Sequence, residues 1–185
     1  MAHVFETAPS GRAKCRGCGE PIAKGEVRFG ERLPNPYGEG EMTLWFHPGC
    51  GALKRPEPFL EALAETETKV EGREELERRA RVGVEHRRLP RLSGAERSPS
   101  GRARCRSCRE PIAKGGWRIS LVYYQEGRFE PAGFIHLGCA SEYFETTDIV
   151  DRIRHFSKLT DDDLDEIGRE LKTTPAASPP PRRRP

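Results

Sequence analysis

The feature that most constrains this chain of 185 residues is a set of metal-type ligands that occurs twice. Each copy reads Cys-x2-Cys, then 28 or 27 residues, then His-x2-Cys. The first set is Cys15, Cys18, His47 and Cys50, and the second set is Cys105, Cys108, His136 and Cys139. The six cysteines of the chain all belong to these two sets. We therefore expect two small units, each folded around its own ligands.

The ligand types in each set indicate zinc. Three thiolates and one imidazole suit the tetrahedral preference of Zn²⁺, and a two-residue spacer lets neighbouring ligands turn back onto one ion. Four protein ligands leave no position for water, so we expect two structural Zn²⁺ ions per chain and no catalytic metal. Disulfides fit poorly, because pairing within a repeat of three cysteines leaves one over. Iron and redox chemistry remain as alternatives.

The sequence around the ligands is itself repeated. Residues 10–29 match residues 100–119 at 14 of 20 positions. The two Cys-x2-Cys pairs lie 90 residues apart and the two His-x2-Cys pairs 89 residues apart. Such a close match predicts two copies of one structural unit.

The positive charge of the chain is concentrated in these repeated segments. The formal net charge is only +3, whereas residues 10–29 carry +3 and residues 100–119 carry +5. Localised basic charge is what a phosphate-binding surface requires, and it favours nucleic acid as the partner. An ordinary solvated surface remains the alternative interpretation.

Hydrophobic and turn patterns predict a hairpin and then a helix in each unit. The first hairpin is expected from strands at 26–33 and 42–46 around a Pro- and Gly-rich turn. The second is expected from a strand at 117–124 that returns towards residues 134 and 135. Helices are expected after each His-x2-Cys, with further ones over residues 149–156 and 164–171. The predicted fold class is small α+β zinc-stabilised domains.

These patterns divide the chain into four segments. They are a first zinc-binding unit over 1–64, a charged and partly helical linker over 65–97, a second unit with C-terminal helices over 98–172, and a disordered Pro/Arg tail over 173–185. A stretch of about 18 apolar residues, as a membrane helix needs, is missing, and so is the apolar core of a signal peptide. We therefore expect an intracellular protein without a membrane partner.

Taken together, the motifs resemble the poly(ADP-ribose) polymerase-type zinc finger. The resemblance rests on Ser-Gly-Arg-Ala before the first cysteine, the Ile-x-Lys-Gly turn, the Arg that begins the next strand, and Trp-Phe-His-x2-Cys in the first unit. It covers about residues 4–63 and 98–171. What it implies is a pair of tandem fingers without the catalytic ADP-ribosyltransferase or ligase region of the best-known members.

The resemblance also implies a function and residue roles. Such fingers recognise DNA strand breaks without reading base sequence: arginines grip the backbone and apolar residues at the hairpin tip cap the exposed base pair. The positions that match as grips are Arg12, Arg28, Arg102 and Arg118, and those that match as caps are Tyr37 and Met42, with Tyr124 and Phe129 as candidates in the second unit. Replacing Arg12 or Arg28 by Ala is expected to weaken DNA binding and to leave the first unit folded.

We therefore expect a monomeric, non-enzymatic protein that binds DNA breaks or ends and works beside DNA repair proteins. It would lie in the nucleus of a eukaryote, or in the cytoplasm and nucleoid of a bacterium. One alternative is a zinc-scaffolded adaptor whose acidic residues 161–166 attract a basic partner. Another is a non-catalytic partner of a DNA repair enzyme on a different chain.

Overall fold

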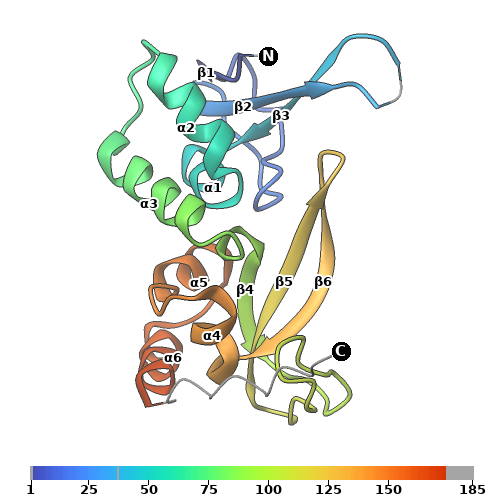
Figure 1. Cartoon of the computed structure of the whole chain (residues 1–185). Coiled ribbons are helices and arrows are strands. Elements are labelled where there is room, and N and C mark those ends of the chain that lie inside the picture. Colours follow the sequence, from blue (N-terminus) through green and yellow to red (C-terminus); the bar gives the residue numbers. More distant parts are fainter. Residues whose placement is uncertain (1, 37, 174–185) are drawn as a thin grey trace, which may run out of the picture. The chain divides into compact units, whose positions relative to one another are not determined.

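A computed structural model describes residues 2–36 and 38–173, which form two compact units (Figure 1). Unit 1 comprises Met1–Arg91 together with Val122–Pro131, and unit 2 comprises Leu92–Leu121 and Ala132–Pro185. Unit 1 contains β1 (Val4–Thr7), β2 (Val27–Pro34), β3 (Glu41–Phe46), α1 (Pro48–Lys54), α2 (Pro56–Glu65), α3 (Arg73–Glu85) and a 3-10 turn (Leu89–Arg91). The remaining elements are β4 (Leu92–Arg97), β5 (Trp117–Gln125), β6 (Arg128–His136), a 3-10 turn (Leu137–Cys139), α4 (Ala140–Phe144), α5 (Val150–Phe156) and α6 (Asp161–Thr173).

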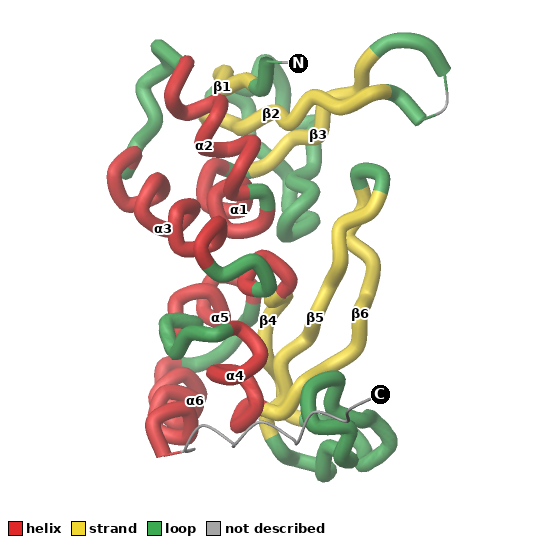
Figure 2. The backbone as a smooth tube through the Cα atoms, viewed as in Figure 1, coloured by secondary structure: helices red, strands yellow, loops and turns green. Residues whose placement is uncertain are grey.

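The strands form two three-stranded sheets with the orders β1-β2-β3 and β4-β5-β6 (Figure 2). In the first sheet β2 is antiparallel to both neighbours, and Glu6 of β1 stands opposite Arg28 of β2. In the second sheet β4 is antiparallel to β5, and Glu96 stands opposite Arg118. The same acidic and basic residues are therefore paired in both sheets, 90 positions apart.

Four phenylalanines form the centre of unit 1. Phe5, Phe29, Phe46 and Phe59 are each at most 3% exposed, and their neighbouring ring centroids lie 5.2–5.8 Å apart. A Cβ on Gly51 of α1 would stand 2.6 Å from the Phe29 ring, so only glycine lets this helix approach the sheet so closely. Helix α3 packs against α1 and α2. This small aromatic core positions the first ligand set.

Unit 2 is closed by short helices on an aliphatic core. Helix α5 packs against β4, and α6 buries Leu164, Ile167 and Leu171. The α6 N-terminus is capped by Thr160, whose Oγ1 accepts from the Asp163 N–H at 3.2 Å. The Asp163 carboxylate accepts in return from the Thr160 N–H at 3.1 Å, which closes a capping box. The sequence predicted a helix over residues 164–171, and α6 contains these residues.

The predicted α+β class is confirmed, and both expected hairpins form. The segment 65–97, expected as a charged and partly helical linker, holds α3 and β4. Helix α3 is the helical part of this segment, and β4 supplies the edge strand of the second sheet. The expected disordered tail lies, except for Thr173, outside the described residues. Among the described helices, none has the length and apolar character to cross a membrane.

Candidate zinc centres and nucleic-acid interface

The fold brings each predicted ligand set together. In both sets the three sulfur atoms and one imidazole nitrogen all lie within 4.8 Å of one another. The Sγ of Cys18 lies 3.4 Å from Nδ1 of His47, and that of Cys108 lies 3.3 Å from Nδ1 of His136. Ligands around a tetrahedral Zn²⁺ with the usual bond lengths lie roughly 3.5–3.8 Å apart, so both sets fit this ion. None of the six cysteines forms a disulfide.

Each ligand histidine is held by a second contact. Nε2 of His47 lies 3.2 Å from the carbonyl oxygen of Pro21, and Nε2 of His136 lies 3.1 Å from that of Pro111. A ring that donates from Nε2 presents an unprotonated Nδ1, which is the atom that faces the cysteines. The Glu-Pro-Ile segment after each Cys-x2-Cys therefore orients the imidazole for metal binding.

Hydrogen bonds to the buried cysteines favour their thiolate form. The backbone N–H of His47 donates to Sγ of Cys15 at 3.3 Å, and that of His136 donates to Sγ of Cys105 at 3.4 Å. A hydrogen bond with Cys50, together with backbone N–H groups, lowers the pKa of Cys15 to about 5 against the opposing effect of burial. Thiolate is the form that binds metal, so these contacts favour the ligand state.

The two Cys-x2-Cys segments, which we call knuckles, differ at the residue that follows the second cysteine. The position after the second cysteine has a positive φ in both, +79° at Gly19 and +71° at Arg109. Glycine adopts this conformation without steric cost, whereas a side chain crowds its own backbone there. The second knuckle therefore folds with local strain that the first one avoids.

The arginines of the two Ser-Gly-Arg-Ala segments are accessible. Arg12 and Arg102 are both exposed, three residues before the first cysteine of their sets. Their position beside a rigid knuckle suits contact with a large anionic partner. The role that the resemblance implied for these two residues stays a prediction.

The arginines that begin the next strands lie in a different setting. Arg28 is 7% exposed, donates to Glu6 from Nη2 at 2.5 Å, and stacks over Trp45 at 3.5 Å. Arg118 is 8% exposed and makes the same two contacts, with Glu96 at 2.5 Å and over the ring of Phe134 at 3.6 Å. Buried and paired guanidinium groups bind their own sheet, so the expected backbone grip by these two residues is not what the structure favours.

The predicted caps are only partly described. Tyr37 lies outside the described residues. Met42 is partly buried, and its Cε lies 2.8 Å from where a Cβ on Gly127 would stand. Gly127 follows β5 and belongs to unit 1. Met42 therefore packs against protein in this structure.

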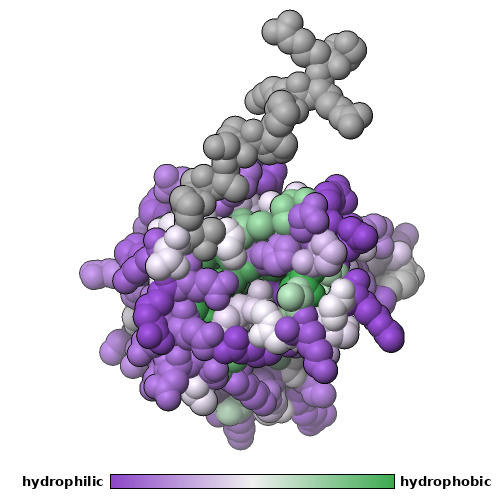
Figure 3. Space-filling model, turned by 90° about the horizontal axis from the view of Figure 1, so that it is seen from below, coloured by the Kyte–Doolittle hydropathy of each residue, from purple (hydrophilic) through white to green (hydrophobic). Residues whose placement is uncertain are grey.

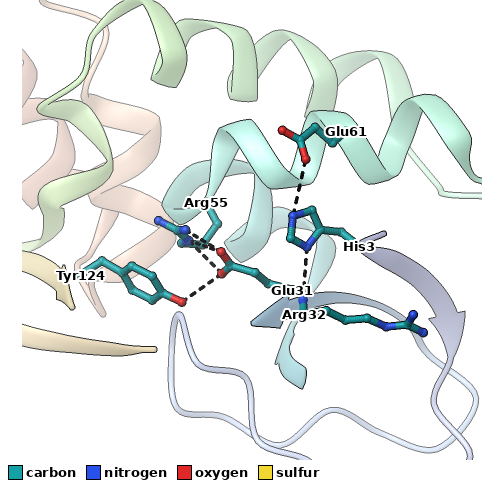
Figure 4. Close-up of polar contacts among 6 residues, drawn as sticks. All are labelled: His3, Glu31, Arg32, Arg55, Glu61 and Tyr124. Carbon is teal, nitrogen blue, oxygen red and sulfur yellow. Dashed lines mark hydrogen bonds and ion pairs between the residues drawn. The ribbon is translucent and has the colours of Figure 1, made fainter. Parts of the chain in front are cut away.

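Tyr124 of β5, one of the two aromatic candidates, belongs to a polar cluster that sequence reasoning missed (Figure 4). The Tyr124 hydroxyl donates to Oε2 of Glu31 at 3.1 Å, and Arg55 donates to both oxygens of Glu31 at 2.8 and 3.0 Å. The Arg55 guanidinium also stacks on Tyr124 at 3.8 Å. Because Glu31 is 1% exposed, it is a buried charge whose compensation comes from these two residues.

Figure 3 shows the hydropathy of the residues on one face of the molecule. Hydrophilic residues predominate on it, and apolar residues form small areas between them. Such a face offers charged and polar contacts rather than a broad apolar surface.

Comparison with known proteins supports the resemblance. The family described as the poly(ADP-ribose) polymerase and DNA-ligase Zn-finger region matches residues 6–87. Poly [ADP-ribose] polymerase 1 of Gallus gallus is 33% identical over 62% of this chain and 13% of its own length. The same enzyme of Oryza sativa subsp. japonica is 28% identical over 74% of this chain and 14% of its own length. Polynucleotide 3'-phosphatase ZDP of Arabidopsis thaliana is 26% identical over 94% of this chain and 29% of its own length.

This chain therefore corresponds to less than a third of the length of each of these three relatives. The matched region contains the first ligand set and the knuckle around it. The second repeat carries the same ligands at nearly the same spacing. Residues 6–87 are therefore similar to the zinc-finger region of poly(ADP-ribose) polymerases and DNA ligases.

Proposed function

We propose that this chain is a zinc-dependent DNA-binding protein that recognises strand breaks or ends without reading base sequence. The observation that carries the proposal is the repeated knuckle. In both copies an assembled Cys3His set lies beside an exposed arginine, Arg12 or Arg102. The ion we assign to both sets is Zn²⁺, in a structural role.

The chemistry of the exposed groups supports DNA as the partner. Guanidinium groups bind phosphate oxygens through two parallel hydrogen bonds, which is stronger than a single contact. Besides Arg102, the second knuckle and its flanks carry three exposed arginines, Arg104, Arg106 and Arg109. Phosphate contacts position a protein on DNA and carry no base information, and binding without sequence preference follows.

The relatives support the same role. Two are poly(ADP-ribose) polymerases, and a third is named for removing phosphate from the 3' end of a polynucleotide. The matched family is described as a zinc-finger region of poly(ADP-ribose) polymerase and DNA ligase. We propose that this chain supplies binding rather than catalysis, as a monomer, alone or beside a repair enzyme, in the nucleus of a eukaryote or the nucleoid of a bacterium.

The residue roles are proposed in two groups. Arg12 and Arg102 contact the DNA backbone, whereas Arg28 and Arg118 hold the sheets that carry the knuckles. Reading of the exposed base pair is assigned to the β2–β3 end of unit 1, with Tyr37 and Met42 as the side chains.

A binding titration tests the proposal. Affinity is measured for nicked, gapped, blunt and covalently closed circular DNA at several salt concentrations. We expect tighter binding to the three broken substrates, and a salt slope whose magnitude falls by about 0.9 for each of Arg12→Ala and Arg102→Ala. Unchanged slopes in both variants would remove these residues from the interface.

A further inference from the structure

Unit 1 contains a small cavity of about 220 Å³ that the DNA contacts above do not use. We call it the basic-aromatic pocket and define it by Lys54, Arg55, Arg91, Tyr123, Tyr124 and Phe129. These residues come from the end of α1, the 3-10 turn after α3, and the parts of β5 and β6 that belong to unit 1. Three stretches far apart in the sequence therefore form one cavity.

Polar and aromatic contacts hold the side chains of the pocket wall in place. Arg55 is fixed from two sides, since it binds Glu31 with two nitrogens and stacks on Tyr124. Phe129 packs edge-on against Phe46 of the core, with 6.3 Å between ring centroids. A site whose side chains are already ordered loses little conformational entropy when a ligand binds.

The lining is cationic. Lys54, Arg55 and Arg91 each carry a positive charge, and none of the residues that line the cavity is acidic. Arg91 is exposed, and so are Arg87 and Arg88, which precede it in the chain. Glu31 does not line the cavity, and its negative charge is compensated by the ion pair with Arg55. A negatively charged ligand would therefore gain from the edge formed by Arg91.

The lining is also aromatic. Tyr123 is 43% exposed, and among the described residues only Val84 is a comparably exposed large apolar side chain. An exposed ring beside several cations offers a flat surface for stacking and charge for a phosphate. Nucleotides combine these two chemical groups.

We propose that the basic-aromatic pocket binds one unpaired nucleotide of a DNA strand, with its base against Tyr123 and its phosphate towards Arg91. The volume decides the size of the ligand. At about 220 Å³ the cavity lies below the range of roughly 300–1,000 Å³ usual for sites that enclose a whole ligand, so it takes a single base. The inference rests on the proposed DNA binding and deepens it. The inference predicts that the chain binds breaks with a gap or a single-stranded extension more tightly than blunt ends.

The test uses the zinc-loaded full chain and three DNAs: a blunt duplex, the same duplex with a three-nucleotide extension, and a covalently closed circle. The wild type is expected to bind the extended duplex at least about 5-fold more tightly than the blunt one, as the loss of one stacked base would cost. Tyr123→Ala should remove this preference without changing affinity for the blunt duplex. Tyr123→Phe should keep it, because the ring remains.

Matched controls separate the pocket from general effects. Val84→Ala removes the other exposed apolar side chain and should leave the preference intact. Arg91→Ala should weaken binding of the extended duplex more than Arg81→Ala, which removes an exposed arginine from α3. Unchanged zinc content shows that each variant is folded.

Three outcomes would overturn the inference: a wild type without preference for the extension, a preference that survives Tyr123→Ala, or an acidic peptide that binds with the same dependence on Tyr123. The proposed function fails separately. If blunt duplex and closed circle bind alike while Tyr123 still governs binding of the extension, break recognition is lost and the pocket stands. If the blunt duplex is preferred over the circle and the extension has no effect, break recognition stands and the nucleotide-binding pocket is refuted.

Discussion

Arg28 lies flat over the indole of Trp45, with its guanidinium carbon 3.5 Å from the ring centroid. Its nitrogens also bind Glu6, so one side chain ties all three strands of the first sheet together. Arg118 makes the equivalent contacts in the second sheet. The repeated arginine at the start of these strands is thus explained by the sheet that it holds.

The first prediction follows from this contact. Arg28→Ala should lower the free energy of unfolding of unit 1 by about 2 kcal/mol, because it removes an ion pair and a stacked cation from a partly buried site. Arg12→Ala should change it by less than about 0.5 kcal/mol, since Arg12 is exposed. Urea denaturation of both variants measures the difference. Equal stability would contradict a structural role for Arg28.

The second prediction concerns the buried Glu31. Arg55→Ala should destabilise the protein by about 3–5 kcal/mol, because it leaves an uncompensated carboxylate in the interior. Arg78→Ala is the matched control: its pair with Glu75 lies on the surface of α3 and should contribute less than about 0.5 kcal/mol. Thermal denaturation that ranks the two variants equally would show that Glu31 does not depend on Arg55.

The third prediction concerns the strained second knuckle. Arg109→Gly should raise the stability of unit 2 by about 1 kcal/mol, because glycine adopts the positive φ without crowding. Gly19→Ala should lower the stability of unit 1 by a similar amount, and no neighbouring atom stands within 4 Å to complicate the comparison. Both changes are measured by chemical denaturation of the zinc-loaded chain. A lower stability for Arg109→Gly, or a higher stability for Gly19→Ala, would refute the conformational argument.

The fourth prediction concerns the metal. Elemental analysis of the native protein should give two zinc ions per chain, and Cys105→Ala should reduce this to one, because each ligand set is complete in itself. A chelator should unfold both units, since metal binding and folding are coupled in small zinc domains. Circular dichroism that is unchanged after removal of the metal would contradict this account.

Sequence reasoning predicted the features that depend on local pattern. The ligand sets were predictable because their spacing is strict, and α6 because Leu164, Ile167 and Leu171 recur at helical spacing. Strands β1 and β4 were missed, because both are short and β4 contains polar residues and a glycine. The sequence did contain a sign of both strands. Glu6 and Glu96 are also 90 residues apart, so the repeat extends upstream of residues 10 and 100, into the segments that form β1 and β4.

The contacts between distant segments were not predictable in the same way. Tyr124 and Glu31 are 93 residues apart, and nothing in their local sequence indicates a hydrogen bond between them. The burial of Arg28 was missed for a related reason, since a basic residue in a basic repeat suggests an exposed phosphate contact. Only the fold shows that Glu6 and Trp45 occupy its guanidinium.

The measurement that tests the central proposal most directly is a competition between two forms of one plasmid, singly nicked and covalently closed, for the zinc-loaded chain at fixed physiological salt. Phosphate number and base sequence are identical in the two forms, and the closed form is relaxed with a topoisomerase beforehand, so only the break differs. We predict that the nicked form binds at least about 5-fold more tightly, as one stacking contact at an exposed base pair would provide. Equal affinity for the two forms would contradict the recognition of breaks.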